Sequence, residues 1–508
     1  MAKKEFTPAQ KIAKESTISF VGMGYGQIIR YLFTAILARL VGAHYLGIYS
    51  LGNSITNLTT VVGKAGTDFG IMRFVSRRDQ KKEIDLIRTD ILSTLKTGFI
   101  FSIIVMIFQI IAARWLVENV FHESSLLQIV LIVFALSIPF TTLTLIATSA
   151  TQGFRLLKYQ IFVEYIINPT ILILSLIFIY YTFSAELAII LPTLITGIVG
   201  FCAANFFLKK IAQVNIFNCY SAKINKEILT FSIPIMCTVI IGSLLHWMDI
   251  LMLGYFTNAE TVGLYHPAAR TAGLQQSILV AFAGIFAPMF SRYFAQNDVI
   301  NMEHIYMLVT RWIITLTIPV LILIVLFAKK MMLLFGAEFI TSANALVLLV
   351  VGTTVFSVFG LSARALVVSG YQNINLINAT VVMIINIILN ILLIPKLGIL
   401  GAAYATSTSM VILSLIRVFE IKIYLKIFPI NVKVLKPIIA GIVTFIVLFL
   451  IKPLIMEYHT ILTLLLALIV TILIYFTILF IFKFDEDDLD FFRSIKFLQK
   501  NIIKNSGE

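Results

Sequence analysis

The sequence predicts an all-α polytopic membrane protein with about 14 transmembrane helices, arranged as two pseudo-symmetric six-helix lobes plus two extra C-terminal helices. Three observations predict this class: apolar stretches along nearly the whole chain, basic residues confined to one side, and a weak internal repeat. Mean hydropathy is +0.99, and 59% of residues are hydrophobic against 13% charged. These values exclude a soluble chain built from ordinary globular domains.

The apolar stretches are long enough to span a bilayer, which takes roughly 20 residues each. The expected spans are 17–41, 46–72, 89–113, 125–151, 159–181, 186–208, 228–254, 262–290, 305–328, 343–369, 373–394, 399–422, 433–451 and 460–482. The longest outer loops, 114–124 and 328–342, are short. We therefore expect a transporter and not an enzyme, with no bound cofactor.

Basic residues orient the spans. With the N-terminus inside, the cytosolic segments hold 27 lysines and arginines and the outer segments hold 5. Such an asymmetry indicates both termini in the cytosol of a multi-pass cytoplasmic membrane protein. The net charge of +14 is then explained by anionic inner-leaflet lipids as partners, without nucleic acid.

A repeat divides the chain. Three pairs of short segments match, at 47–49 and 263–265, 153–154 and 370–371, and 166–168 and 384–386. Their offsets of 216, 217 and 218 residues place each pair at the same point of a six-span block. The predicted organisation is a cytosolic or interfacial N-terminal segment (1–16), a first six-helix lobe (17–210), a cytosolic linker (211–227), a second six-helix lobe (228–424), two appended helices (425–482) and a cytosolic amphipathic tail (483–508).

Basic residues inside spans suggest a cationic cavity. An ionised side chain at the bilayer centre costs about 2.5–3.5 kcal/mol on insertion scales, so it should face protein or water. Arg30, Arg270 and Arg364 lie deep in three different spans, with too few acids to neutralise them. Lys64 lies four residues before Asp68, and the two are expected to pair on one helix face. A cationic cavity selects anions, and guanidinium suits phosphate.

A second cluster is polar. Asp249, Asn386, Asn390 and Thr406 are expected at similar depth in the outer half of the second lobe. One carboxylate with amide and hydroxyl oxygens suits a hard cation such as Na⁺, or a proton. Ordinary hydrogen bonding between helices, worth about 0.6 kcal/mol per contact, explains the same pattern equally well.

Two regions of the sequence, each made of two short segments, resemble a known family. Residues 38–42 and 46–49, with 262–265 and 268–270, resemble the polysaccharide transporter (oligosaccharide flippase) branch of the multidrug/oligosaccharidyl-lipid/polysaccharide exporter superfamily, similar to O-antigen and lipid II flippases. The resemblance implies alternating access between two lobes and a lipid-linked oligosaccharide as substrate. Proteins of polysaccharide assembly are then further expected partners.

The resemblance also implies roles for the two clusters. Basic residues on spans 1, 2 and 8 line the cavity of lipid II flippases, which Arg30, Lys64 and Arg270 resemble. Those flippases hold sodium with an acid on span 7, a polar pair on span 11 and a threonine on span 12. The second member of the polar pair is acidic there and is Asn390 here, which lowers the charge of the site.

Two other functions fit a chain of this class. An ion-coupled exporter of drugs or metabolites belongs to the same superfamily, but exporters of cationic drugs need acidic cavities. A membrane-embedded glycan polymerase or ligase needs a long outer loop with catalytic residues. The sequence therefore favours a flippase that moves pyrophosphate-linked oligosaccharide for cell-surface polysaccharide or glycoconjugate synthesis.

Overall fold

A computed structural model describes residues 8–482, and side chains from Val21 on. Within that range every regular element is a helix, and thirteen helices are long and apolar enough to cross a membrane. The predicted all-α membrane class is confirmed. The predicted tail at 483–508 and the first seven residues of the N-terminal segment lie outside the described residues, and helix α1 already begins at Pro8.

Helix α1 (Pro8–Gly63) contains two of the predicted spans. Gly42 interrupts it with φ 79° and ψ 178°, a conformation that favours glycine, and the chain is helical on both sides. At 1.5 Å per residue, the part after Gly42 is about 30 Å long, enough for a span of its own. Counting both parts of α1 gives the fourteen spanning helices that the sequence predicts.

The predicted span 46–72 is wrong in one respect, because the helix breaks inside it. α1 ends at Gly63, and Ala65 and Gly66 both have positive φ before α2 (Thr67–Gln80) begins. Two consecutive left-handed residues cannot continue an α-helix. A Cβ on Gly66 would also lie 2.3 Å from the carbonyl oxygen of Ser232, so α8 packs against this turn.

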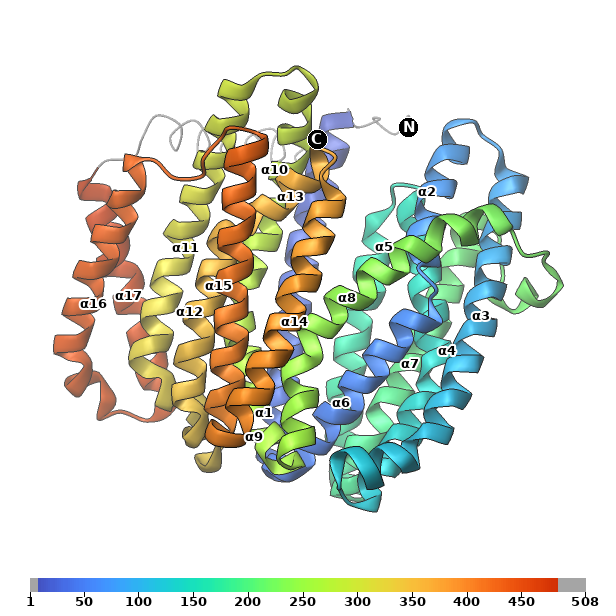
Figure 1. Cartoon of the computed structure of the whole chain (residues 1–508). Coiled ribbons are helices and arrows are strands. Elements are labelled where there is room, and N and C mark those ends of the chain that lie inside the picture. Colours follow the sequence, from blue (N-terminus) through green and yellow to red (C-terminus); the bar gives the residue numbers. More distant parts are fainter. Residues whose placement is uncertain (1–7, 483–508) are drawn as a thin grey trace, which may run out of the picture. The chain divides into compact units, whose positions relative to one another are not determined.

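The described chain forms two compact units, of which the first comprises 1–271, 335–345 and 379–409. Its helices beyond α1 and α2 are α3 (Ile84–Trp115), η1 (Leu116–Phe121), α4 (Ser125–Gly153), α5 (Leu157–Ile161), η2 (Phe162–Ile167), α6 (Asn168–Thr182), α7 (Ala185–Ala212), η3 (Ile216–Ser221), α8 (Lys226–Phe256), most of α9 (Ala259–Gly273), η4 (Ala337–Ser342) and parts of α14 (Gln372–Leu397) and α15 (Ile399–Tyr424). Helix α4 packs on α3 and α7, which buries Leu95, Ile146 and Phe201 (Figure 1).

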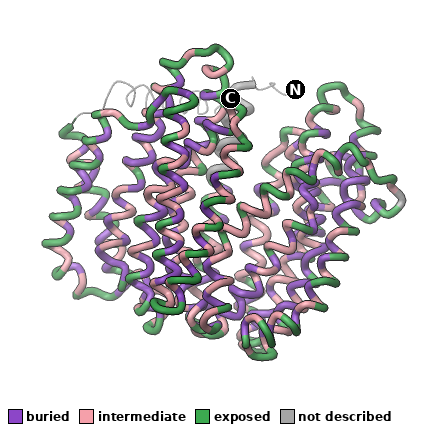
Figure 2. Tube along the Cα trace, in the orientation of Figure 1, coloured by how far each residue is buried: buried purple, intermediate pink, exposed green. Residues whose placement is uncertain are grey.

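The second unit comprises 272–334, 346–378 and the chain from Met410 on. It holds α10 (Gln276–Ala295), α11 (Val299–Leu333), most of α12 (Ala343–Phe359), α13 (Leu361–Val368), η5 (Val432–Val434), α16 (Leu435–Met456) and α17 (Thr460–Ile481). The two last helices pack on each other and on α11. Much of their remaining surface is exposed (Figure 2). It carries apolar side chains such as Ile442, Leu450 and Leu473, which suits contact with lipid.

The repeated residues meet inside the first unit. A Cβ on Gly47 would lie 1.6 Å from the carbonyl oxygen of Ala259, and a Cβ on Gly263 would lie 1.8 Å from that of Ala43. Gly47 and Gly263 are 216 residues apart, as are Ala43 and Ala259, which is the offset of the repeat seen in the sequence. Helices α1 and α9 thus cross through a reciprocal contact of equivalent residues. The lobe boundaries themselves stay a prediction.

Candidate functional site

Arg30 is held inside the first unit by a π-helix. Its Nη2 donates to the main-chain carbonyl oxygen of Glu164 at 2.9 Å, and its guanidinium lies 5.4 Å from the ring centroid of Tyr165. Both partners belong to η2. A π-turn leaves carbonyls without their usual α-helical partner and is frequent at functional sites. The local irregularity therefore supplies the acceptor that positions Arg30.

Arg270 lies near Arg30 in the same unit. Its Nη2 donates weakly to Oε1 of Gln27, at 3.5 Å, and the two guanidinium groups lie within electrostatic range of each other. Both also act on the hydroxyl of Tyr49. The structure thus brings together two arginines that are 240 residues apart in the sequence. Their function in anion binding stays a prediction.

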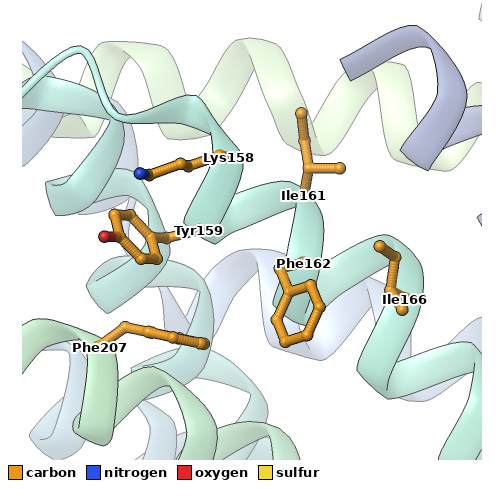
Figure 3. Close-up of a pocket in the computed structure, with 6 residues that line it drawn as sticks. All are labelled: Lys158, Tyr159, Ile161, Phe162, Ile166 and Phe207. Atoms are coloured by element: carbon orange, nitrogen blue, oxygen red, sulfur yellow. The ribbon is translucent and has the colours of Figure 1, made fainter. Parts of the chain in front are cut away.

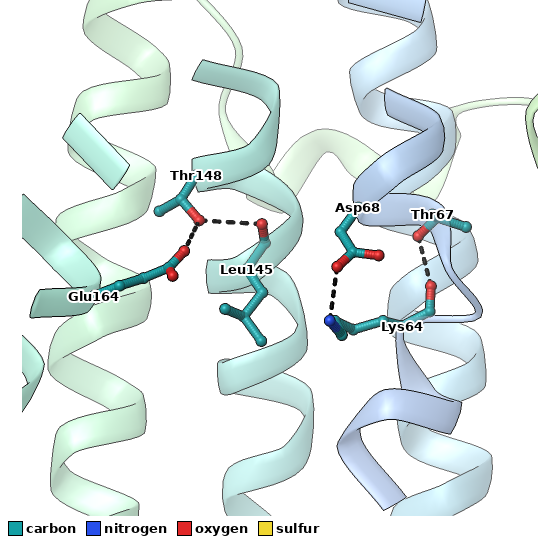
Figure 4. A network of polar contacts seen from close by, with 6 residues as sticks. All are labelled: Lys64, Thr67, Asp68, Leu145, Thr148 and Glu164. Carbon is teal, nitrogen blue, oxygen red and sulfur yellow. Dashed lines mark hydrogen bonds and ion pairs between the residues drawn. The ribbon is translucent and has the colours of Figure 1, made fainter. Parts of the chain in front are cut away.

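Lys64 and Asp68 form the predicted ion pair. Nζ of Lys64 lies 2.7 Å from Oδ2 of Asp68 (Figure 4). They do not share one helix face, as the sequence suggested, because Lys64 lies in the turn after α1 and Asp68 in the first turn of α2. Asp68 neutralises much of the charge that Lys64 would bring to a cationic site.

Arg364 belongs to the second unit. It is exposed on α13 in the second unit, whereas Arg30, Lys64 and Arg270 all belong to the first. Its expected place in the cavity remains a prediction.

Three of the four residues predicted for the polar cluster take part in two bonded groups of the first unit. The hydroxyl of Tyr265 donates to Oδ2 of Asp249 at 2.5 Å. Nδ2 of Asn390 donates to Oδ1 of Asn386 at 3.0 Å. Asn390 is fully buried, and its own Oδ1 has no partner. A buried oxygen without a donor is the kind of group that a cation satisfies.

The donor set of this cluster is that of a hard monovalent ion. It contains one carboxylate, two amides and hydroxyls, which are oxygen ligands. The part of the chain that the structure describes contains no group of three His, Cys, Asp or Glu side chains suited to a metal ion. The residues therefore fit Na⁺ or a proton better than a transition metal.

Sequence reasoning missed three residues of this region. In the sequence Tyr265 stands out only as part of the repeat, yet its hydroxyl donates to the carboxylate of Asp249. His246 and His266 both lie within electrostatic range of Arg270, and His246 also of Asp249. A signal for the two histidines was present in the sequence, because ionisable residues such as histidine are rare in spans and usually functional there.

A separate cavity of about 320 Å³ lies between α5, η2 and α7. Its walls are mainly aromatic and aliphatic, with one basic residue, and are formed by Lys158, Tyr159, Ile161, Phe162, Ile166 and Phe207 (Figure 3). Nζ of Lys158 lies 4.8 Å from the ring centroid of Tyr159, and that ring lies 5.0 Å from the ring of Phe207. None of the residues predicted from the sequence lines it.

Comparison with known proteins decides the family. The model of a family described as polysaccharide biosynthesis protein matches residues 12–294, more than half of the 508 residues. The chain belongs to this family. It is a multi-pass membrane protein, as the sequence predicts, with thirteen helices in the described residues that are long and apolar enough to span a membrane.

Individual relatives have low sequence identity to this chain, and some match only part of it. An uncharacterized membrane protein of Methanocaldococcus jannaschii is 23% identical over 84% of this chain and 87% of its own length. A probable low-salt glycan biosynthesis flippase of Haloferax volcanii is 28% identical over 33% of this chain and 36% of its own. The structure of a lipid II flippase in its inward closed conformation has a TM-score of 0.75 at 16% identity, covering 92% of this chain and 98% of that one. This last likeness shows a shared fold.

Proposed function

We propose that this protein flips a lipid-linked, pyrophosphate-bearing oligosaccharide across the cytoplasmic membrane, with both termini in the cytosol. The observation that carries the proposal is that Arg270 contacts Gln27, one helical turn before Arg30 on α1, so both arginines lie in the same part of the first unit. Two like charges placed together inside spans repel each other, so their arrangement is favourable when an anion lies between them. Guanidinium groups bind phosphate through paired hydrogen bonds.

The family supports a glycan as the cargo. Its description is polysaccharide biosynthesis, and a relative in Haloferax volcanii is a probable glycan biosynthesis flippase. A sugar–pyrophosphate head group is polar and needs a hydrated path, while its lipid chain stays in the bilayer. Movement alone completes the reaction, which needs no catalytic group.

The test is flipping by the purified full-length chain in liposomes. Arg270→Ala should lower the flipping rate of a fluorescent lipid-linked oligosaccharide by at least tenfold, because the deep cation that binds the pyrophosphate is lost. Arg114→Ala is the matched control, since Arg114 is exposed and pairs with Glu118 at 2.8 Å. Full flipping by the Arg270→Ala protein, with normal membrane insertion, would overturn the proposal.

A coupling ion is proposed for the Asp249 cluster. Asp249, Asn386, Asn390 and Thr406 would supply the oxygens that bind Na⁺, and a proton on Asp249 is the alternative. An ion there ties α8, α14 and α15 together and biases the transporter toward one conformation. Flipping in sodium-free buffer at a constant proton gradient separates the two, because persistence at full rate excludes sodium.

A further inference from the structure

Glu164 is an acid in the cationic region that the proposed mechanism does not use. Its Oε1 accepts a hydrogen bond from the hydroxyl of Thr148 at 2.6 Å (Figure 4). This donor is neutral. Within the described side chains, no lysine or arginine nitrogen lies within 4.0 Å of the Glu164 carboxylate.

The same residue contacts Arg30 through its backbone. The main-chain carbonyl oxygen of Glu164 accepts a hydrogen bond from Arg30, so the backbone of the π-helix η2 positions the guanidinium. The carboxylate of the same residue lies at the end of its side chain and does not take part in this bond. Arg30 and Lys64 are the cations that act electrostatically on this carboxylate. Glu164 is therefore a counter-charge to Arg30 that does not form a closed ion pair with it.

The titratable neighbours of Glu164 are few. Helix α1 and the turn after it contribute Arg30 and Lys64, α2 contributes Asp68 as the partner of Lys64, and η2 itself contributes Tyr165. Helix α4, which supplies Thr148, has no charged residue. The charged and tyrosine residues of the other packed helices lie near the helix ends and are Lys158 and Tyr159 on α5, Tyr180 and Tyr181 on α6, and Glu186, Lys209 and Lys210 on α7. Helix α7 also contains Cys202, which is exposed.

The charges nearly balance. Arg30, Arg270 and Lys64 bring three positive charges, and Asp68 and Glu164 bring two negative ones, which leaves a net charge of +1. Loss of the Glu164 charge doubles this to +2. An anion entering the site meets repulsion from the one carboxylate that has no basic partner, since that of Asp68 is already neutralised.

We propose that Glu164 is the internal counter-ion of the anion site. Its carboxylate competes with the phosphate of the ligand for the field of Arg30, and loss of its charge strengthens anion binding. The proposal rests on the proposed function in one respect, that this region binds an anion. Glu164 acts through Arg30 and is a positioning residue for it.

The direction of the pH effect follows by linkage. A proton on Glu164 removes a negative charge, so the protonated site binds an anion more tightly, and anion binding in turn favours proton uptake. Anion affinity should therefore fall as pH rises. In Glu164→Gln the part of this dependence that belongs to Glu164 should vanish, and affinity at pH 8.0 should take the high value, while His246 and His266 beside Arg270 keep their own contribution.

The experiment measures sulfate binding to the full chain in phosphatidylcholine nanodiscs. Sulfate keeps the same charge from pH 5.5 to 8.0, so any pH effect belongs to the protein. The shift of Tm with sulfate concentration, at constant ionic strength, gives the Kd. At pH 8.0 we expect Glu164→Gln to bind sulfate roughly tenfold more tightly than the wild type, as removal of one charge within a few ångström predicts.

Two further variants make the result specific. Glu164→Asp keeps the charge and should retain both the weaker affinity and its pH dependence. Glu118→Gln removes an exposed acid of the same unit, whose Oε1 pairs with Arg114, and should change neither. A merely structural function of Glu164 would lower Tm without shifting the Kd for sulfate.

Each outcome has one meaning. Unchanged sulfate affinity in a folded Glu164→Gln protein overturns this inference and leaves the flippase proposal standing. Sulfate binding by no variant refutes the anion site and both proposals with it. Failure of lipid-linked oligosaccharide flipping, with the sulfate results as expected, refutes only the substrate. If Glu164→Gln does not fold, Glu164→Ala takes its place, and unchanged sulfate affinity of that protein at pH 8.0 overturns the inference.

Discussion

Two copies of one short motif, at 47–49 and 263–265, lie in the same unit and have different neighbours. Their glycines pack backbone to backbone in a reciprocal crossing of α1 and α9. Their tyrosines differ: Tyr49 lies near Arg30 and Arg270, whereas Tyr265 donates to the carboxylate of Asp249. The repeat has kept the packing of the backbone and allowed the chemistry beside it to diverge. One copy adjoins the proposed anion site and the other the proposed cation site.

The largest expected effect comes from breaking the shared packing. Gly47→Ala or Gly263→Ala places a Cβ less than 2 Å from a backbone carbonyl oxygen, which no side-chain rearrangement relieves. We expect a loss of stability of about 3 kcal/mol or more, at or above the upper end of ordinary overpacking. Thermal unfolding of the purified protein in nanodiscs measures it.

Gly242→Ala is the control for this experiment. No atom lies within 4 Å of the Cβ that it adds to α8, so the change should be neutral or slightly stabilising. Wild-type Tm in either crossing variant would show that the reciprocal contact does not exist.

A smaller effect separates the two tyrosines. Tyr265→Phe leaves the buried Asp249 without its hydroxyl donor and should cost about 1.5–3 kcal/mol, the usual value for a hydrogen bond to a charged group. Tyr49→Phe keeps the ring contacts with Phe33 and Phe134 and should cost less than about 1 kcal/mol. Equal losses on chemical or thermal unfolding would mean that the two copies do not differ in chemistry.

The smallest effect sharpens the assignment of the cation site. Asn390→Asp adds a carboxylate beside Asn386, so it should tighten sodium binding about tenfold while lowering Tm in sodium-free buffer. Asp249→Asn should abolish the sodium response. Titration of Tm with sodium chloride against choline chloride measures both, and Asn119→Asp, at an exposed position of η1, is the control. An unaltered sodium response in Asn390→Asp would remove Asn390 from the site.

Sequence reasoning found the membrane class because that class depends on composition. Apolar length, the charge asymmetry and the offset of the repeat are local or additive quantities that can be read without coordinates. The same reasoning paired Lys64 with Asp68 correctly but placed them on one helix, because the left-handed residues Ala65 and Gly66 carry too weak a signal to end a span.

The sequence by itself determined the all-α membrane class, the number of spans and the residue types of both clusters. Only the tertiary structure decided which of these residues meet. It showed that Arg30 and Arg270 share one unit while Arg364 belongs to the other, that Tyr265 donates to Asp249, and that a π-helix sets Glu164 beside Arg30. The physical reason is that a membrane span requires only a long apolar segment. Contacts between distant helices depend on kinks and close backbone crossings, such as those at Gly42 and Gly47, which the hydrophobic pattern of the sequence does not reveal.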